Sequence, residues 1–532
     1  MSISTNLARS TVRQLIEVGI EDAVLSPGSR NAPLSIALYQ AEQKGLIRLH
    51  VRIDERGAAF FALGITKATG KYVPVVCTSG TAVANYYPAV LEAHHSDNNL
   101  LLLTADRPAR LRKTGSNQTT LQANIFGEFV RHNIDTAAPV DLEHLLNGSG
   151  PVHLNLQFDV PLLPEDSHDW LEGIHHRELK PEPVHTSHIE VATTRNIVIV
   201  GHDRAGFSER EIEKLARDLG APLITEDPLR FKGALAHAPI LLSDERVRKE
   251  LTPELAVIIG RTTLSRSTSA YIDLAQKTLV IDPRAKRIDS ARGADEILAV
   301  MPAVKIRVNS DRNWLQAWNS FESLAKEALS NYPEWSEGAL ASLVAADLEN
   351  DSALFVSSSR PIRDLEAFAT PRADVTTYAN RGLAGIDGSI STAMGIATHH
   401  DETFAIIGDL AFLHDISALS NPTKDVLTII VVDNNGGGIF STLPQQGVAG
   451  FEKIFGTPHD RNIAKIVSGF GISNEVVTSA KELHIALQRI HPNIHVIVAK
   501  MPARTENSKM LSRLQSKFSI EVKNLNGIGI ET

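Results

Sequence analysis

Cysteine is almost absent from the sequence: Cys77 is the only one in 532 residues, so no disulfide can form within the chain. The first residues also lack the basic-then-apolar layout of a secretory signal, and we therefore expect a cytoplasmic protein. Long apolar runs are missing as well, since a run such as 427–432 is far shorter than the ~20 residues of a membrane-spanning helix. No membrane association is expected.

An excess of positive charge is lacking too. The net charge of -9 offers no general attraction to a phosphate backbone, so we expect no nucleic-acid partner. The 20 histidines, which include the pair His399-His400, show no convergent metal-ligand spacing. We interpret them as surface or packing residues. The remaining composition, 43% hydrophobic and 22% charged, is that of an ordinary globular protein.

The chain is longer than the roughly 250–300 residues at which a single core stops growing, so two or three domains are expected. From residue 21 onward, short β-rich runs alternate with helical patterns, which is typical of parallel sheets covered by helices on both faces. We therefore predict an α/β protein with three doubly wound parallel-sheet domains. The predicted parts are a first domain at 1–165, a linker at 166–194, a middle domain at 195–304, a helical connector at 305–350 and a third domain at 351–532.

Two polar motifs follow apolar strands of the third domain. Gly408-Asp409 ends one strand, and Asn434-Asn435-Gly436 ends the next, 25 residues after Asp409. This interval suits one crossover helix between neighbouring parallel strands, which would bring both motifs to the same sheet edge. Carboxylate, amide and carbonyl oxygens are ligands suited to Mg²⁺, so the motifs predict a site for a magnesium-bound diphosphate. Two unrelated turns explain the same residues equally well.

A cluster of acids marks the first domain, where segment 52–57 changes from strand to helix and contains Glu55. Acidic residues at a helix start are favoured by the helix dipole. On these residues alone, helix capping is the favoured explanation, and a role in catalysis is the alternative.

Together these motifs resemble the thiamine-diphosphate (ThDP)-dependent family of decarboxylases and synthases. Its members have Gly-Asp followed after a similar interval by Asn-Asn, and an acid at the end of an early strand. The resemblance covers essentially the whole chain, in the order pyrimidine-binding, Rossmann-like middle and diphosphate-binding domains. It implies ThDP as cofactor, with Mg²⁺ or alternatively Mn²⁺.

The resemblance also implies roles for individual residues. Glu55 would be the catalytic acid that hydrogen-bonds the aminopyrimidine ring of the cofactor. Asp409, Asn434 and the carbonyl of Gly436 would hold the metal, although Asp433 leaves the choice among positions 433–435 open by one residue. Further cofactor-binding residues implied are Gly408, Ile386, Ile439 and Phe440, the last three by apolar contact, for which ordinary packing is the alternative.

Segments 26–38, 105–112, 115–119, 379–393 and 434–444 resemble one subgroup of that family. Its members decarboxylate 2-oxoglutarate and add the succinyl carbanion equivalent to isochorismate, in menaquinone biosynthesis. Both substrates are dicarboxylates, which the planar guanidinium of arginine binds well. The substrate-binding residues implied are Ser29, Arg30, Arg107, Gln118, Ser359, Arg363, Arg381, Leu443 and, from the middle domain, Arg266. Any single arginine could instead be a solvated surface charge.

Three other functions are open. An acetolactate-synthase-type carboligase would use a monocarboxylate, for which paired arginines make little sense. A nucleotide-binding oxidoreductase is suggested by segment 196–208, which nevertheless lacks the spaced glycines of a dinucleotide site. A non-catalytic protein with the ThDP fold is the third. The family further implies a homo-oligomer, a dimer or a dimer of dimers, in which Glu55 of one chain meets Asp409 of another.

Overall fold

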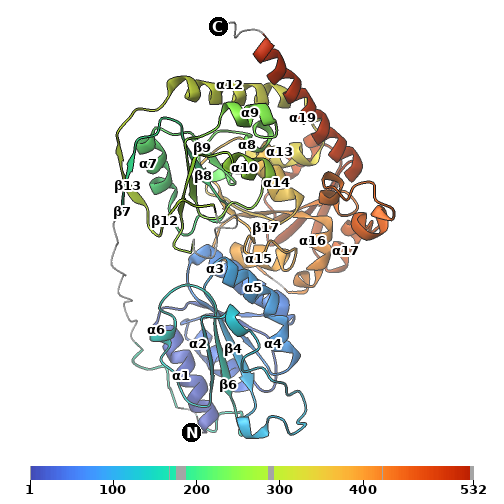
Figure 1. The fold of residues 1–532 in the computed structure, drawn as a ribbon. Coiled ribbons are helices and arrows are strands. Elements are labelled where there is room, and N and C mark those ends of the chain that lie inside the picture. The colour runs from blue at the N-terminus through green and yellow to red at the C-terminus, as the bar shows by residue number, and fades with distance from the viewer. Residues whose placement is uncertain (1, 167, 175–186, 285–292, 422, 528–532) are drawn as a thin grey trace.

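A computed structural model describes residues 2–166, 168–174, 187–284, 293–421 and 423–527. Three α/β units built on parallel sheets follow one another along the chain, which confirms the predicted fold class. In Figure 1 the first unit lies at the bottom, the middle unit at the upper left and the third unit at the right. In the part of the chain described, no helix is both long and apolar enough to cross a membrane.

The first unit is a six-stranded sheet with the order β2-β1-β3-β4-β6-β5, all neighbours being parallel. Its central strands are buried along their whole length, because helices cover both faces. The strands are β1 (Asp22–Leu25), β2 (Arg48–Val51), β3 (Val73–Cys77), β4 (Leu100–Asp106), β5 (His132–Thr136) and β6 (Val152–Gln157). The helices are α1 (Ile3–Glu17), α2 (Ala32–Gln43), α3 (Glu55–Thr69), α4 (Thr81–Asn85), α5 (Tyr87–His95) and α6 (Leu142–Leu145), with 3-10 turns η1 (Ala109–Leu111) and η2 (Gly127–Phe129).

The middle unit is a parallel sheet with the order β12-β11-β10-β8-β9. The predicted linker contains β7 (Ser187–Val191), which pairs with β13 (Pro302–Ile306) beside this sheet, while 175–186 lie outside the described residues. The other strands are β8 (Asn196–Val200), β9 (Leu223–Thr225), β10 (Leu255–Ile259), β11 (Lys277–Ile281) and β12 (Glu296–Leu298). The helices are α7 (Glu209–Leu219), α8 (Ala238–Leu241), α9 (Glu245–Glu250) and α10 (Arg266–Ile272), with the 3-10 turn η3 (Pro228–Arg230).

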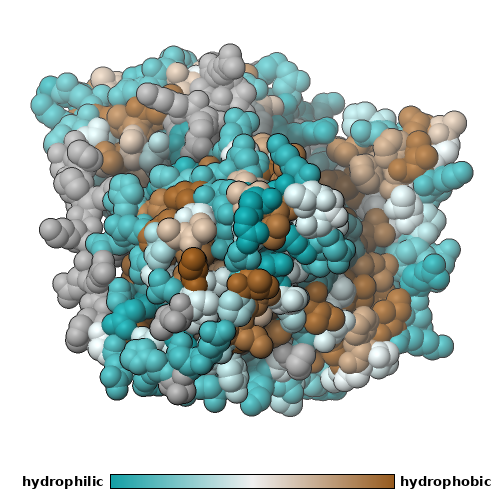
Figure 2. Space-filling model, turned by 90° about the horizontal axis from the view of Figure 1, so that it is seen from below, coloured by the Kyte–Doolittle hydropathy of each residue, from teal (hydrophilic) through white to brown (hydrophobic). Residues whose placement is uncertain are grey.

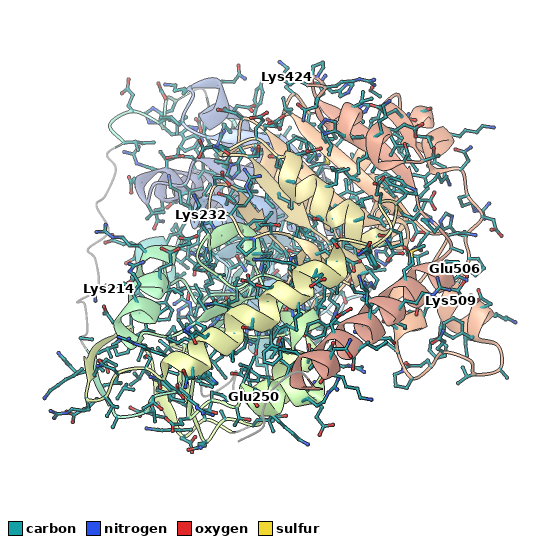
Figure 3. The ribbon with its side chains drawn as sticks, turned by 90° about the horizontal axis from the view of Figure 1, so that it is seen from above. Lys214, Lys232, Glu250, Lys424, Glu506 and Lys509 are labelled. Atoms are coloured by element: carbon teal, nitrogen blue, oxygen red, sulfur yellow. The ribbon has the colours of Figure 1, made fainter. Side chains whose placement is uncertain are left out.

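Two helices, α12 (Arg312–Leu329) and α13 (Glu337–Asp347), lie in the segment 305–350 between the middle and third units. Trp314 and Trp318 of α12 are buried against the middle unit together with Phe518 of the C-terminal helix α19 (Arg504–Gly527). Figure 3 shows α12 and α19 side by side, with Glu506 and Lys509 on α19. The last helix therefore returns from the third unit to the middle unit.

The third unit repeats the strand permutation of the first, with the order β15-β14-β16-β17-β19-β18. The crossover between β16 and β17 is a short helix, α16, followed by a 3-10 turn, η4, rather than one long helix. The strands are β14 (Ala353–Val356), β15 (Thr376–Tyr378), β16 (Thr403–Gly408), β17 (Leu427–Asp433), β18 (Ser473–Val477) and β19 (Ile494–Lys500). The remaining elements are α14 (Arg360–Phe368), α15 (Ser389–Ala397), α16 (Asp409–His414), α17 (Ile463–Gly469), α18 (Ala480–Leu487), the 3-10 turns η4 (Ile416–Ser420) and η5 (Gly438–Thr442), and the π-helical turn η6 (Glu452–Gly456).

Helices α3 and α15 join the first unit to the third, and they lie at the boundary between the two in Figure 1. The helices approach so closely that a Cβ on Gly64 would stand 2.2 Å from the carbonyl oxygen of Thr392. A Cβ on Gly395 would in turn stand 2.1 Å from the carbonyl oxygen of Phe61. One apolar core runs through this crossing into both sheets, so α3 is held rigidly against the third unit.

Candidate active site

The two polar motifs of the third unit meet at the carboxyl edge of its sheet. Strands β16 and β17 are parallel neighbours, with Gly408 opposite Val432, so Asp409 and Asn434 follow adjacent strand ends as predicted. Asp409 begins α16 and is 2% exposed, while Asn434 is 7% exposed. Two short polar side chains are thus buried at the edge where open α/β sheets bind ligands.

Asn434 has a free acceptor inside this edge. Its amide nitrogen donates to Oε1 of Glu337 at 2.7 Å, but its Oδ1 is buried and has no hydrogen-bond partner. The carboxylate of Asp409 accepts the backbone N–H of Gly436 at 2.8 Å. An unpartnered buried oxygen is costly, and a cation or a donor beside it would remove that cost. The donor set therefore fits a hard divalent ion.

The loop after β17 depends on Gly436. Its φ is 137°, and a Cβ there would stand 2.1 Å from the carbonyl oxygen of Gly456, so no larger residue fits. Its own carbonyl accepts the N–H of Gly438 at 2.9 Å. Asn435 has a left-handed φ of 61° and bonds Asp460 through its side chain. By contrast, a Cβ on Gly408 would meet nothing within 4 Å, so open space lies beside Asp409.

His459 stands next to these acids and was not predicted. Its Nε2 lies 3.3 Å from Oδ2 of Asp409 and 3.6 Å from Oδ1 of Asp433. Its Nδ1 accepts the N–H of Arg461, so Nε2 carries the proton that points at Asp409. The hydrogen bond to Asp409 raises the pKa of His459. The carboxylate predicted to bind a metal thus already lies within hydrogen-bonding distance of an imidazole N–H.

Asp433, the residue that left the choice of metal ligand open, has partners of its own. One oxygen pairs with Lys500, and the other accepts the N–H of Asn435 at 3.3 Å. Its charge is therefore largely balanced within the protein.

Glu337 is a second residue that the sequence did not reveal. It is the first residue of α13, in the connector, and it is 5% exposed. Burial raises its pKa to about 7, and the nearby charge of Asp364 adds to the effect, opposed by Arg360. In the sequence Glu337 follows Ser336 at a helix start, which signals only a cap. No local pattern links it to Asn434.

Glu55 does not cap its helix. The cap of α3 is Asp54, whose carboxylate accepts the N–H groups of Arg56 and Gly57. Helix capping, the favoured explanation for this acidic cluster from the sequence, is therefore the role of Asp54 and not of Glu55. Glu55 is half-buried, and no hydrogen bond or ion pair holds it among the residues that the structure describes. Burial raises the pKa of the Cys77 thiol, and the charge of Glu55 adds to this rise, which places the carboxylate near the end of β3.

The start of α3 contacts the third unit of the same chain. Arg56 donates to the carbonyl of His414 at 2.8 Å, and Ser417 donates to Asp54 at 2.6 Å. These contacts lie at the C-terminal end of α16, whereas Asp409 lies at its start. Within the described ranges, no hydrogen bond or ion pair connects Glu55 with Asp409.

Four substrate residues expected in the first unit gather at its carboxyl edge. Arg107 donates to Oγ of Ser79 at 3.1 Å and to the carbonyl of Gln118 at 2.9 Å, and the Gln118 amide donates to the carbonyl of Ser79. Burial lowers the pKa of Arg30, and the charge of Arg107 lowers it further, so the two cations are close. Ser29 precedes Arg30 and is exposed. Two neighbouring guanidinium groups repel each other unless an anion joins them.

Arg363 lies in the third unit against the middle unit. Its side chain donates to the carbonyls of Ser359 at 2.7 Å and Leu264 at 3.2 Å. Ser359 has a left-handed φ of 79° at the start of α14. Arg266 lies two residues beyond Leu264, at the start of α10, and is exposed. The hydrogen bond to Leu264 thus brings the middle-unit segment of Arg266 beside Arg363.

Arg381 is the most deeply buried of the predicted arginines, at 5% exposed. It donates to Oγ1 of Thr263 at 2.8 Å, but its Nε and Nη1 are buried without a hydrogen-bond partner. Two buried acids lie nearby: burial, together with the charge of Glu226, raises the pKa of Glu366 well above its usual value. A buried guanidinium with unused donors is suited to an anionic ligand.

The expected apolar residues divide between two loops. Ile386 packs on the core shared by the first and third units. Ile439 and Phe440 lie on η5 and Leu443 follows it, all three being half-buried. The ring of Phe440 lies 5.4 Å from that of Phe455. These three residues lie on the loop that follows Gly436, so they border the candidate metal site.

The middle-unit loop that suggested a nucleotide site packs on one side against the end of β10, while its residues 202–204, 206 and 207 line a cavity that Arg381 also borders. A Cβ on Gly260 would stand 1.9 Å from the carbonyl oxygen of Asp203, and Asp203 forms an isolated β-bridge with Arg261. Arg284 pairs with the carboxylate of Asp203 at 2.9 Å. This loop is therefore a structural contact between the ends of β8 and β10.

Three family models match consecutive parts of the chain. They are the N-terminal TPP binding domain of thiamine pyrophosphate enzymes at residues 5–126, the middle domain at 164–356 and the C-terminal TPP binding domain at 365–499. Thiamine pyrophosphate (TPP) is another name for ThDP. The matches follow the order of the three units.

Curated relatives extend over nearly the full length. A protein of Thermobifida fusca is 37% identical over 92% of this chain and 94% of its own. A protein of Nocardioides sp. is 38% identical over 93% of this chain and 95% of its own. A protein of Geobacillus kaustophilus is 34% identical over 97% of this chain and 98% of its own. All three are named 2-succinyl-5-enolpyruvyl-6-hydroxy-3-cyclohexene-1-carboxylate (SEPHCHC) synthase.

Proposed function

Because the chain belongs to the ThDP-dependent enzymes and, within them, to the family of SEPHCHC synthases, we propose that it decarboxylates 2-oxoglutarate and adds the succinyl unit to isochorismate. The products are SEPHCHC and CO₂, and the enzyme is a transferase of menaquinone biosynthesis. The same proposal includes the cytoplasmic location expected from the sequence. The buried, unpartnered Oδ1 of Asn434 beside Asp409 is the observation that carries the proposal.

Asp409, Asn434 and the carbonyl of Gly436 hold Mg²⁺, or alternatively Mn²⁺, on the diphosphate of ThDP. The open space beside Gly408 supports this assignment, because a diphosphate needs close approach to the backbone there. When bound, ThDP supplies carbanion chemistry, while the protein supplies position and charge. The carbonyl of Gly436 accepts the N–H of Gly438 with one lone pair, and its second lone pair is available for the metal.

Glu55 holds a proton at the aminopyrimidine ring of the cofactor. Glu55 has no hydrogen-bond or ion-pair partner among the described residues. Asp54, not Glu55, caps α3, so the carboxylate of Glu55 is available for this role. Ile386, Ile439 and Phe440 keep water from the cofactor by apolar contact. A dry site strengthens every charge interaction within it.

The substrate carboxylates bind two groups of cations. Arg30 and Arg107, with Ser29 and Gln118, form the first-unit group, and their mutual repulsion is relieved by an anion. Arg363 and Arg381, with Ser359, form the second group, and the unused donors of Arg381 support it. Arg266 borders the site of a substrate carboxylate, and Leu443 borders the site of isochorismate, the ring substrate. A monocarboxylate such as pyruvate leaves one of the two groups without a partner.

The active enzyme is a homo-oligomer, a dimer or a dimer of dimers, in which Glu55 of one chain completes the site of another. Exposed apolar residues of the first unit include Ile53, two residues before Glu55 and 69% exposed, and Leu121, 70% exposed. Figure 2 shows apolar side chains gathered between polar ones on the face seen from below. Apolar surface of this kind is buried in stable oligomers.

Mass spectrometry tests the reaction directly. The protein is incubated with ThDP, Mg²⁺, 2-oxoglutarate and isochorismate, and the expected result is CO₂ together with one condensed product. Preference for pyruvate, or CO₂ release that does not depend on isochorismate, contradicts the assignment.

Subunit mixing tests the shared site: Glu55→Gln and Asp409→Ala chains, each inactive alone, should regain part of the activity as heterodimers. Proven heterodimers without activity would contradict sharing.

A further inference from the structure

One carboxylate of the middle unit ties two of its loops together. Glu226 directly follows β9 and is 2% exposed. Its Oε1 accepts the backbone N–H groups of Thr263 at 2.5 Å and Leu264 at 2.7 Å. Its Oε2 accepts the N–H of His202 at 3.2 Å. Because the neighbouring strands β8 and β10 lead into these two loops, Glu226 fixes the carboxyl edge of the middle sheet, and it does so by hydrogen bonds to a charged acceptor, which are stronger than those between neutral groups.

Two of these loop residues also hold the third-unit arginines to which a substrate carboxylate is assigned above. Arg381 donates to Oγ1 of Thr263 at 2.8 Å, and Arg363 donates to the carbonyl oxygen of Leu264 at 3.2 Å. Thr263 and Leu264 therefore each contact Glu226 through the N–H and an arginine through an oxygen. Two arginines from separate elements of the third unit thus depend on one buried acid of the middle unit.

The backbone next to Arg381 is fixed independently of Glu226. Glu92 of α5 accepts the N–H groups of Gly382 at 2.6 Å and Leu383 at 2.7 Å. Loss of Glu226 would therefore change where the guanidinium of Arg381 points, while the loop that carries this arginine stays in place.

The charge of Glu226 reaches both arginines without occupying their donors. Burial lowers the pKa of Arg381, and the charge of Glu226 opposes this change. Burial lowers the pKa of Arg363 as well, opposed by the charges of Glu366 and Glu226. Among the described residues, no hydrogen bond or ion pair joins Glu226 directly to either arginine. The buried Nε and Nη1 of Arg381 therefore remain available to a ligand.

A second buried acid, Glu366, is close enough to Glu226 for the two charges to interact. Burial raises the pKa of Glu366 well above its usual value, and the charge of Glu226 adds to the rise. Burial also raises the pKa of Glu226, but the N–H groups of Leu264, His202 and Thr263 oppose this rise. Glu366 is therefore protonated near pH 7, while Glu226 carries the negative charge that its three N–H donors stabilise.

We propose that Glu226 is a positioning residue, which aims Arg363 and Arg381 at a substrate carboxylate. It acts through the two loop residues between them, Thr263 and Leu264. This inference rests on the proposed function, in which both arginines bind a dicarboxylate. A direct ion pair with an acid would fill the donors that the substrate needs, whereas an acid one residue removed holds the guanidinium groups and leaves those donors free. The middle unit thereby contributes to substrate selection.

Steady-state kinetics of the enzyme saturated with ThDP and Mg²⁺ tests the proposal, with 2-oxoglutarate and isochorismate varied in turn. Glu226→Gln keeps an oxygen for the N–H groups of Thr263 and Leu264 but removes the charge. We expect it to raise KM about 10- to 100-fold for only one of the two substrates, the one that Arg363 and Arg381 bind, with a smaller change in kcat. Thr263→Val removes the hydroxyl that accepts from Arg381, and it should raise the same KM about tenfold.

Glu254→Gln is the matched control. Glu254 is another acid of the middle unit, and its Oε2 accepts the backbone N–H groups of Thr194 at 2.6 Å and Arg195 at 3.3 Å. These two residues lie just before β8, at the opposite edge of the same sheet. This variant should keep both KM values. If Glu226 has a structural role only, both KM values, the affinity for ThDP and the midpoint of thermal unfolding should change together.

Three results would overturn the proposal. The first is a folded Glu226→Gln protein that keeps both KM values, and the second is a rise of both KM values together with weaker ThDP binding. If circular dichroism shows that Glu226→Gln does not fold, Thr263→Val decides, because an unchanged KM overturns the proposal and a rise for one substrate alone supports it. The third is an unchanged protein that does not turn over 2-oxoglutarate. That result contradicts the proposed function itself, and it differs from the other two because the unchanged protein, not a variant, gives it.

Discussion

A single methyl group at Gly64 should loosen the contact between the first and third units. The added Cβ would stand 2.2 Å from the carbonyl oxygen of Thr392 and 3.0 Å from Cα of Gly395. Both are backbone atoms that cannot rotate away, so the helices must move apart, at a cost of about 2–3 kcal/mol, the upper part of the range for overpacking. Alanine is favoured over glycine inside a helix by about 1 kcal/mol, which offsets part of this cost. The expected net destabilisation of Gly64→Ala is therefore about 1–2 kcal/mol.

Thermal unfolding, followed by circular dichroism, measures this effect. A destabilisation of about 1–2 kcal/mol lowers the midpoint temperature of unfolding by roughly 2–8 °C for a domain of about 150–250 residues. Gly469→Ala is the control, because a Cβ on this α17 residue meets nothing within 4 Å. It should leave the midpoint unchanged or raise it slightly. If Gly64→Ala is as stable as Gly469→Ala, the helices are not in the close contact described, and the argument for a rigid α3 fails.

Three further predictions concern the site. Gly408→Ala should keep its midpoint without cofactor but bind ThDP about tenfold more weakly or worse, measured by calorimetry, because its methyl group enters the open space beside Asp409. Arg381→Met should lower kcat/KM for the dicarboxylate substrates roughly 10- to 100-fold with ThDP affinity unchanged, as steady-state kinetics will show. Burial raises the pKa of Asp415 from 3.8 to about 6, so the native state binds this proton more tightly than the unfolded chain, and stability is lost as the pH rises through about 6. Asp415→Asn should therefore gain stability relative to the unchanged protein, by up to about 3 kcal/mol between pH 4 and 7, in urea unfolding.

Much of the fold could be predicted because it depends on local patterns. Apolar runs of strand length, separated by helical stretches, predict parallel sheets, and the strand ends then fix which residues share an edge. Asp409 and Asn434 were predicted together for this reason, and the pairing of β16 with β17 brings their strand ends side by side. The strand β7 was missed, because its pattern is short and it pairs with β13 far along the chain.

The missed residues of the site have no local signature. Glu337 reaches Asn434 from the connector, 97 positions away in sequence, and at its own position it resembles a helix-start acid. His459 reaches Asp409 from a loop 50 positions later. Such contacts arise from how helices and loops pack on the finished sheet, and a pattern of spacing along the chain does not contain that information.

These missed residues bear on which side chain would bind the proposed metal. Asp433 offers the stronger charge, but Lys500 and a backbone N–H already occupy its two oxygens. Asn434 is neutral, yet its Oδ1 is buried and unused, and Glu337 fixes the amide so that this oxygen points inward. A cation entering beside Asp409 therefore gains a ligand at Asn434 without breaking an ion pair, while at Asp433 it would first have to displace Lys500. The pairing of Asp433 with Lys500 thus favours Asn434, and a cation bound at Asp409 would replace the hydrogen bond from His459.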